Sequence, residues 1–455
     1  MLTRTAYEDS HLSLWLRVRT FAMPPTVIET ATARRHAGDW AGACAAAGVD
    51  VELTPRAVAR RHGRELADQV RADLRRLAPD LLRWHLPRVA PDGLLRPGLT
   101  VPLARYVTDG RDGRASPHLV VRTPPAWAAG GQRLSLALWH GAEPEPAARR
   151  HPHPRPSRRF RLDLHRHLWD AERAHELRTR AGADRQPEEG RLVPDPAERW
   201  PAEARILLRA EGRPSGSVAA RCAARQWLVL DLDGDAPPGV RIATTPTDGR
   251  GTTLPMLPEA AIRPLPDLEL VRAGLIEVDR LHPLVASALA PDRPPSDPPP
   301  PSDPPSPADP ARQARLVECR GARHRIGLVD GTLVPLDHDP DEIRREELLA
   351  ALGGIPLPCL GAVHEAHRRP DQLAAVRERL AHGDTAGALA VVEGLLGPAA
   401  LLPGGALRDE LEAAARRRVD HGLFRAGLAG PGPGRVLLPG RPRPDGHRTR
   451  PRHAR

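Results

Sequence analysis

Residues 291–310 read PDRPPSDPPPPSDPPSPADP. Proline fixes the backbone φ angle, removes the amide donor and biases the preceding residue towards extended geometry, so neither a helix nor a sheet ladder can continue through this stretch. Segments of this composition form semi-rigid polyproline II spacers. We therefore predict a Pro-rich linker over 291–311, which separates a mixed α/β body at 24–290 from a smaller domain at 312–428.

The body shows both helical and strand periodicity. A helix is indicated where apolar residues recur every three or four positions, at Leu66, Val70, Leu74, Leu77 and Leu81. Strands are indicated by short runs rich in Val and Leu between glycine-containing turns, at 99–106, 118–121 and 133–139, and again at 217–222, 226–232 and 240–245. The fold class that we expect is α+β, an antiparallel sheet with flanking helices.

The smaller domain begins with a predicted hairpin, whose strands span 316–320 and 324–337 and turn at Asp330-Gly331. Asp339 then caps a helix that carries Pro340 at its first position. Further helices are expected at 371–381, 385–396 and 406–423. The domain should be a β-hairpin packed on a helical bundle.

Two helix junctions share the pattern Gly-Asp-x-Ala-Gly-Ala, at residues 38–43 and 383–388. This pattern resembles the corner of tetratricopeptide-like helical hairpins, in which small residues let two helices pack closely. Stacked repeats need about three or more units, so two copies predict two separate helical hairpins and no array.

The basic charge is concentrated in two segments. All 67 basic residues are Arg, and neither Lys nor Asn occurs, which is typical of a very GC-rich bacterial genome. The net charge of +10 lies in residues 149–161 and in the tail, so the rest of the chain is close to neutral. We predict a disordered N-terminal extension over 1–23, an Arg/Pro-rich loop over 143–159 and a disordered Arg-rich tail over 429–455.

Flexible arginines can neutralise phosphates and give non-specific, salt-sensitive binding to nucleic acid. The candidate contacts are Arg149, Arg150, Arg155, Arg158, Arg159, Arg441, Arg443, Arg448, Arg450 and Arg452. No aromatic residues alternate with them to stack on bases, so the segments can equally be solvated surface.

The four cysteines are scattered and form no C-x-x-C pair, which argues against a disulfide framework and favours buried, reduced thiols. The first residues lack the basic-then-apolar order of a signal peptide, and the longest apolar region is broken by prolines. We expect a cytoplasmic protein without a membrane segment.

A possible catalytic motif is Trp227-Leu-Val-Leu-Asp231-Leu-Asp233-Gly234, which resembles the first motif of haloacid-dehalogenase-type phosphohydrolases. The resemblance implies Asp231 as the nucleophile and Asp233 as the acid/base. However, Asp235 and two prolines follow where that family continues into a helix, and the chain has no Lys to bind phosphate. The alternative is a hairpin turn.

Histidines provide two candidate metal sets. If residues 160–167 are extended, Asp163, His165 and His167 lie on one face and could ligate zinc or another divalent metal. In the smaller domain, Cys359, His364 and His367 could do the same. The alternatives are a solvated strand face for the first set and an inert buried thiol with helix-surface histidines for the second. His324 is also expected to face Asp337 across the hairpin.

The sequence contains no Gly-x-Ser-x-Gly motif, phosphate-binding Gly-rich loop, His-Glu-x-x-His motif or dinucleotide-binding fingerprint. The sequence therefore favours a non-catalytic, cofactor-free adaptor or accessory protein that contacts a protein partner through two units joined by a stiff spacer. The alternatives are a nucleic-acid-associated protein that uses its Arg-rich segments, and a metal- or Asp-dependent hydrolase.

Overall fold

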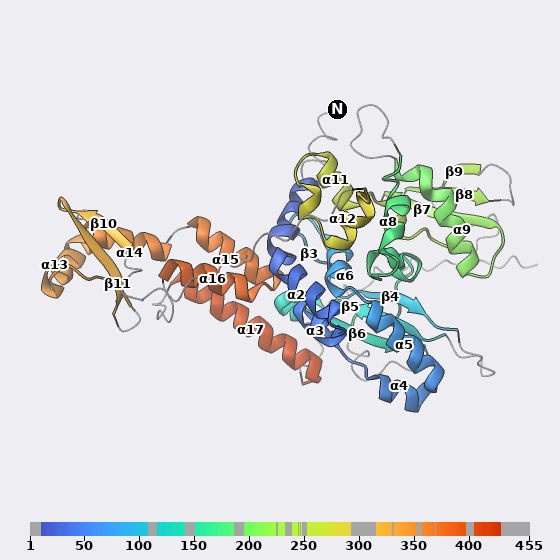
Figure 1. The fold of residues 1–455 in the computed structure, drawn as a ribbon, viewed down its shortest axis with the longest axis horizontal. Helices are drawn as coiled ribbons and strands as arrows, with labels where there is room; N and C mark the ends of the chain where they lie inside the picture. The colour runs from blue at the N-terminus through green and yellow to red at the C-terminus, as the bar shows by residue number, and fades with distance from the viewer. Residues whose placement is uncertain are drawn as a thin grey trace, which may run out of the picture.

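The computed structural model describes residues 11–107, 116–141, 151–185, 195–223, 226–232, 239–243, 245, 247, 253–292, 315–329, 332–352, 357–368, 370–396 and 405–428. It confirms a mixed α/β fold in which antiparallel sheets carry flanking helices and a small sheet with helices lies at the C-terminal end (Figure 1). No helix among these residues is long and apolar enough to cross a membrane.

The main sheet has the strand order β1-β6-β5-β4. The three predicted strands are present as β4 (Thr100–Arg105), β5 (His118–Arg122) and β6 (Leu134–Trp139), and they pair antiparallel. The sequence did not predict the short edge strand β1 (Val49–Val51), which pairs parallel to β6.

The largest core packs helices against this sheet. The predicted apolar stripe lies on α5 (Arg64–Arg76), whose Leu66, Val70 and Leu74 join the buried side chains of the strands. Trp169 is completely buried in the same core. The remaining helices of this part are α2 (Pro25–His36), α3 (Trp40–Ala46), α4 (Pro55–His62), α6 (Pro79–His85), α8 (Leu177–Ala181), α10 (Glu259–Ile262), α11 (Pro266–Arg272) and α12 (Pro283–Leu289).

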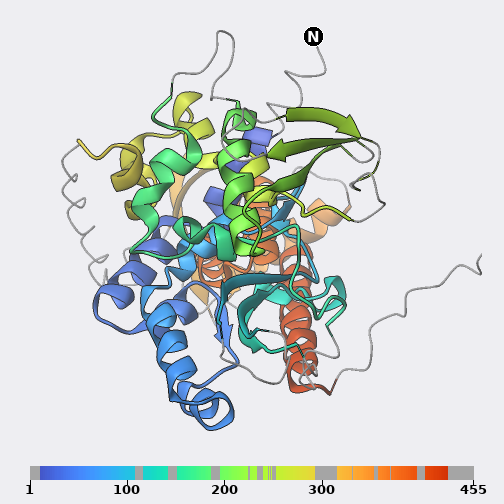
Figure 2. The same ribbon diagram turned by 90° about the vertical axis from the view of Figure 1, so that its right-hand side faces the viewer.

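The three further strands predicted for the body are present, and they form a second sheet, an antiparallel meander. It consists of β7 (Gly216–Ala223), β8 (Gln226–Leu232) and β9 (Gly239–Ala243), and α9 (Trp200–Ala210) packs on it (Figure 2). A two-stranded ribbon of β2 (Arg88–Val89) and β3 (Leu94–Leu95) lies beside the main sheet.

The expectation of a disordered extension is wrong for its described part. Residues 11–17 are helical and continue into a short π-helix, η1 (Val18–Ala22). Leu14 and Val18 are buried in a small core with Trp84 and Leu270, so this segment is held by apolar burial on the body.

The C-terminal helices α15 (Pro370–His382) and α17 (Ala406–Ala426) also pack on the body, α16 (Thr385–Leu396) packs on α15, and α17 runs beside the main sheet (Figure 2). Arg17 donates to Glu378 at 2.8 Å, and Arg83 donates to the carbonyl oxygen of His382 at 3.0 Å. Residues 312–428 are therefore arranged as a small β-containing module and a helical part bound to the body. The predicted linker is described only at residues 291–292.

Both predicted helical hairpins form with the same corner. Gly38 and Gly383 have positive φ angles of 75° and 88°, which favour glycine. Asp39 accepts a hydrogen bond from the amide of Gly42 at 2.8 Å, and Asp384 accepts one from the amide of Gly387 at 2.9 Å. Each aspartate caps the second helix of its pair.

Candidate metal centre

Four side chains converge inside the small C-terminal module. They are Cys319, His324, His338 and Cys359, and one potential ligand atom from each lies within 4.8 Å of those of the other three. This is the one group of three or more possible metal ligands found among the described residues.

A tight hairpin positions the first two side chains. Cys319 ends β10 (Arg315–Cys319), and His324 lies in β11 (Ala322–Val329). Arg320 and Gly321 form the two-residue turn with φ angles of 52° and 80°, the geometry of a type I′ turn. Since Val317 pairs with His324, and side chains alternate along a strand, Cys319 and His324 project from the same face of the sheet.

The other two side chains come from the chain that follows. After β12 (Thr332–Pro335), His338 directly precedes Asp339, whose side chain caps α13 (Pro340–Ala351). Cys359 lies in the first turn of α14 (Pro358–Arg368), and this helix packs across β10 and β12. The sheet and α14 together close the site from two sides.

The distances fit a small ion after minor adjustment of side chains. Nδ1 of His324 and Nε2 of His338 are 2.6 Å apart. Metal–nitrogen bonds of about 2.0–2.1 Å and metal–sulfur bonds of about 2.3 Å place tetrahedral ligand atoms roughly 3.3–3.8 Å apart. Rotation of the two imidazole rings, moving each nitrogen by a few tenths of an ångström, would lengthen the distance between Nδ1 of His324 and Nε2 of His338 to this range. Without an ion, the same contact is a hydrogen bond between the two rings.

The site is enclosed by apolar side chains. Cys319 and Cys359 are buried in a cluster with Leu357 and Leu360. Burial, and then the neighbouring Cys319 thiol, raise the pKa of the Cys359 thiol to about 11 in the metal-free protein. Burial thus favours the protonated thiol, whereas a bound cation would favour the thiolate, because a coordinating thiol loses its proton.

A carboxylate lies behind one of the histidines. Nδ1 of His338 is 3.4 Å from Oε2 of Glu342, one helical turn into α13. Carboxylates in this position fix the tautomer and orientation of a ligating imidazole and increase its basicity. The arrangement thus leaves Nε2 of His338 available to a metal.

The donor set defines the chemistry that the site can support. Two thiolates and two imidazoles in an enclosed tetrahedral arrangement are typical of structural zinc. Four protein ligands leave no open position for a substrate or an activated water molecule. The residues present therefore fit a structural metal centre.

The metal set predicted from Asp163, His165 and His167 does not form. Residues 160–167 are not extended, because they contain the 3-10 turns η4 (Leu162–Leu164) and η5 (Arg166–Leu168). Asp163 pairs with Arg161, while Nε2 of His165 is 3.2 Å from Oε2 of Glu203. Burial opposes ionisation of Glu203, but hydrogen bonds from His165 and Arg180 lower its pKa to about 2.

The predicted phosphohydrolase motif lies in an unsuitable structural setting. Asp231 is near the end of the central strand of an antiparallel meander, where it accepts hydrogen bonds from Ser217 and Arg241. Asp233 lies outside the described residues. The strand-to-helix unit of that family requires a different topology, and the hairpin alternative agrees with the observed pairing.

The second predicted metal set is only partly retained. Cys359 is in the converging group, whereas the side chains of His364 and His367 lie outside the described residues. The expected His324–Asp337 pair does not form, because Asp337 accepts hydrogen bonds from Arg325. Cys359 lies instead beside Cys319, His324 and His338, and the sequence pattern indicated neither Cys319 nor His338 as a metal ligand.

The predicted nucleic-acid residues are described only at Arg155, Arg158 and Arg159. Arg155 and Arg158 are exposed, but Arg159 donates two hydrogen bonds to Glu259, at 2.7 and 2.9 Å. Residues 151–159 contain neither a helix nor a strand, as expected for a loop, but this part packs on the body: His151 is buried, and its Nε2 donates to the carbonyl oxygen of Thr123 at 2.9 Å. Arg149, Arg150, Arg441, Arg443, Arg448, Arg450 and Arg452 lie outside the described residues.

A sequence signal for the site does exist. Cys319-x4-His324 brackets the hairpin turn, and His338 and Cys359 stand at the start of two successive helices.

No known protein family, curated protein or solved structure matches the chain. The geometry therefore carries the functional argument alone.

Proposed function

We propose that residues 315–368 form a zinc-binding module and that the protein is a non-catalytic adaptor that contacts a protein partner through this module. The observation that carries the proposal is the convergence of two cysteines and two histidines within 4.8 Å. Zinc is the metal that this donor set suits best, and the closed coordination argues for a structural role.

The small core of the module supports a structural role for the ion. Among the side chains whose burial the structure describes, its buried cluster comprises Cys319, Leu357, Cys359 and Leu360, with Val317 and Ile343 partly buried against it, and the module also buries Ile326 and Val363. A core of this size supplies little net stability to a unit of some 50 residues, and natural modules of this size commonly add a metal. Zinc binding would then supply free energy of folding.

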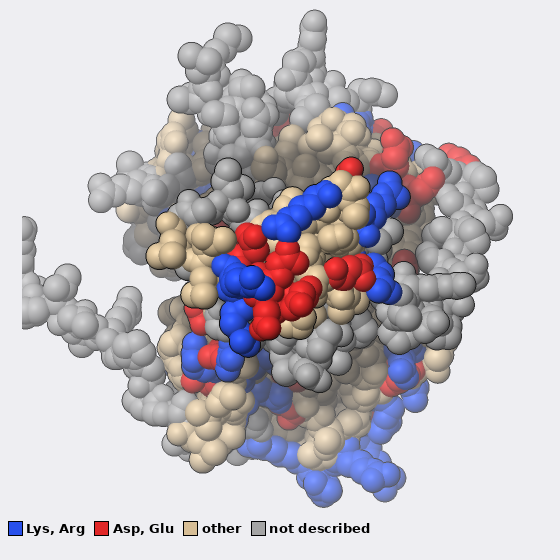
Figure 3. Space-filling view, turned by 90° about the vertical axis from the view of Figure 1, so that its left-hand side faces the viewer, with Lys and Arg blue, Asp and Glu red and all other residues tan. Residues whose placement is uncertain are grey.

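The surface of the module supports a role in binding. Helix α13 exposes Leu348 and Leu349, its C-cap residue Leu352 is also exposed, and the module stands at the end of the molecule away from the body (Figure 1). On this end, acidic side chains gather with basic ones at their edge (Figure 3). Within the module, Arg320 forms ion pairs with Glu342 and Glu346. Apolar side chains beside charged ones are common at protein interfaces.

The thiol ligands favour a reducing compartment. The four cysteines are free thiols, and Cys319 and Cys359 must remain reduced to ligate an ion. This agrees with a cytoplasmic location, where disulfides are rare.

Metal analysis of the purified full-length protein tests the proposal. We expect about one zinc per chain in the wild type and less than a tenth of that in Cys319→Ser and Cys359→Ser. Cys222→Ser is the matched control, because Cys222 is an exposed thiol in the second sheet and should retain full zinc.

A protein pull-down with the same variants then tests the adaptor role. A partner captured by the wild type and by Cys222→Ser, but lost in Cys319→Ser, would support it. Wild-type protein without zinc after purification and reconstitution under reducing conditions would overturn the metal proposal. A partner retained by the zinc-free variant would overturn the proposed use of the module.

A further inference from the structure

A cavity of about 500 Å³ lies between the N-terminal segment, the β2–β3 ribbon and residues 259–266. None of the residues that line it belongs to the metal centre. This volume falls within the range of small-molecule sites, roughly 300–1,000 Å³. Its walls are mainly apolar, but they also carry seven arginines and three histidines against a single carboxylate, Glu259.

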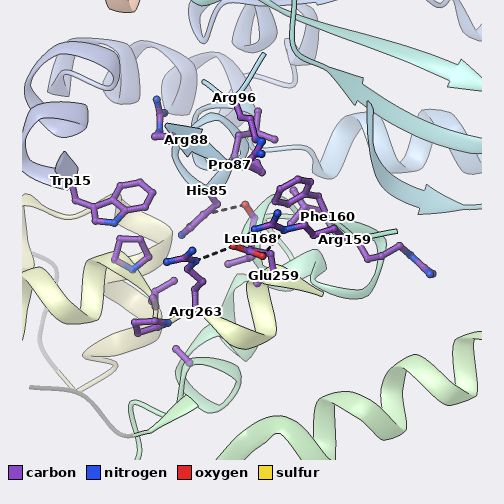
Figure 4. A pocket seen from close by; sticks show the side chains of 18 of the residues that line it. Trp15, His85, Pro87, Arg88, Arg96, Arg159, Phe160, Leu168, Glu259 and Arg263 are labelled. Atoms are coloured by element: carbon purple, nitrogen blue, oxygen red, sulfur yellow. Dashed lines mark hydrogen bonds and ion pairs between the residues drawn. The ribbon is translucent and has the colours of Figure 1, made fainter. Parts of the chain in front are cut away.

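Four of these arginines have acidic partners. Arg159 and Arg263 share Glu259, as the dashed contacts in Figure 4 show. Arg161 and Arg180 pair with Asp163 and Glu203, respectively. Their charge is therefore compensated within the protein.

The other three, Arg88, Arg96 and Arg199, have no carboxylate partner among the described residues. Arg88 donates to the carbonyl oxygens of Gly93 and Arg83, at 2.9 and 2.8 Å, and its Nε is buried with no partner. Arg199 is buried and donates to the carbonyl oxygen of Arg180. A buried cation without a paired carboxylate is costly, so an anion in the cavity would offset that cost for Arg88.

The ribbon brings two of these charges to one wall. Arg88 begins β2, and Arg96 follows β3, where its amide donates to the carbonyl oxygen of Pro87 at 2.8 Å. Figure 4 shows Arg88 and Arg96 on the same side of the cavity. A carboxylate, sulfonate or phosphate placed there would lie beside Arg96, whose side chain is exposed, and beside Arg88, whose Nε has no partner.

A buried histidine adds a further unpaired polar atom. His167 is 5% exposed and lines the cavity, and its Nδ1 has no hydrogen-bond partner. Burial, and then the neighbouring His165 and Arg180, lower the pKa of His167 well below its usual value. The neutral ring can donate to a ligand or accept from one.

Two aromatic side chains flank the space beside this charged wall. Trp15 stands on one side and Phe160 on the other, with His85 between them (Figure 4). Leu168 and Leu177 add aliphatic surface. The lining therefore suits a ligand with an apolar or aromatic body as well as an acidic head.

We propose that this cavity binds an amphiphilic organic anion, with its acidic head at Arg88 and Arg96 and its apolar body between Trp15 and Phe160. The site is independent of the zinc module, so either proposal can fail without the other.

Fluorescence titration of the full-length protein with 1-anilinonaphthalene-8-sulfonate, an aromatic sulfonate, tests the proposal. We expect one saturable site, displaced by decanoate but not by decyltrimethylammonium, a cation with a chain of the same length. Arg96→Gln removes an exposed charge that has no ion-pair partner among the described residues, and should weaken binding at least tenfold. Arg155→Gln, an exposed arginine outside the cavity wall, should leave it unchanged.

A second variant tests the location without changing the charge. Ala260 lines the cavity and is partly exposed, so Ala260→Trp should fill the space and abolish saturable binding. Affinities within twofold of the wild type in both Arg96→Gln and Ala260→Trp would overturn the proposal. Equal displacement by the cationic amphiphile would also overturn it, because an apolar surface alone would then explain the binding.

Discussion

Gly130 packs directly against the backbone of Arg417 on α17. A Cβ atom on Gly130 would lie 2.0 Å from the carbonyl oxygen of Arg417, a distance that no side chain can adopt. Gly131 makes a similar contact with Gly383, because a Cβ atom on Gly383 would lie 2.1 Å from the carbonyl oxygen of Gly131. The C-terminal helices therefore approach the body so closely that only glycine fits between them.

Gly130→Ala should loosen this docking. The methyl group requires α17 or the turn to move, and overpacking of this kind costs about 1–3 kcal/mol of unfolding free energy. We expect a lower urea midpoint and faster amide exchange in α17. The control, Gly422→Ala, adds a methyl group on the same helix where nothing lies within 4 Å. It should stabilise the protein by about 0.5–1 kcal/mol, because alanine favours a helix over glycine. Equal effects from the two variants would contradict the close contact.

Acid should weaken the same junction through His382. Burial, and then the charge of Arg88, lower the pKa of this histidine to about 4. Between that value and the ordinary pKa near 6.5, the unfolded chain binds more protons than the folded one. Stability thus rises with pH across this window, and the contribution of His382 is lost as pH falls through it.

His382→Phe removes this titration while keeping a ring beside Phe21, whose ring centroid is 6.2 Å from that of His382. Urea titrations at pH 7 and pH 4.5 should show that the variant loses less stability on acidification than the wild type, by roughly 2 kcal/mol. Other buried histidines keep part of the pH dependence in both proteins. Identical losses in both proteins would mean that His382 does not titrate in this window.

The variant His165→Ala tests whether the metal is held by the converging group or by the set of Asp163, His165 and His167. His165 is buried against Glu203, so its removal leaves a cavity and weakens a buried charge network, which should cost about 2–4 kcal/mol of unfolding free energy. Its zinc content should stay at that of the wild type, because the ring lies outside the converging group. Loss of zinc from a folded His165→Ala protein would restore the metal set predicted from the sequence.

Glu342→Gln should weaken metal binding without removing a ligand. The carboxylate lies 3.4 Å from Nδ1 of His338, and loss of such a partner typically lowers metal affinity about 10–100-fold. Competition with a chromophoric zinc chelator measures the change. Glu347→Gln, an exposed position on the same helix, is the matched control and should bind as the wild type does. A common affinity for the two variants would argue against this role of Glu342.

Local patterns in the sequence predicted much of the fold. The apolar stripe of α5, the antiparallel strands of both sheets in the body and the Asp339 cap are each specified within about a dozen residues, whereas the parallel edge strand β1 is not. Contacts between distant residues were not predictable in this way. Gly130-Gly131 reads as an ordinary turn, and nothing near it indicates that α17 packs there.

The metal centre illustrates the same limit. Cys319 and Cys359 are separated by two strands and a helix, and no short spacing links them as C-x-x-C would. The composition also obscured the site, because histidine is common in this chain and each one alone indicates little. Only the folded β-sheet and α14 bring the four side chains together.

X-ray absorption at the zinc edge of the full-length protein tests the central claim most directly. The structure predicts a first shell of two sulfur atoms at about 2.3 Å and two nitrogen atoms at about 2.0–2.1 Å, with the sulfur contribution lost in Cys319→Ser. A shell made only of nitrogen and oxygen, or one with the same sulfur content in that variant, would contradict the assignment.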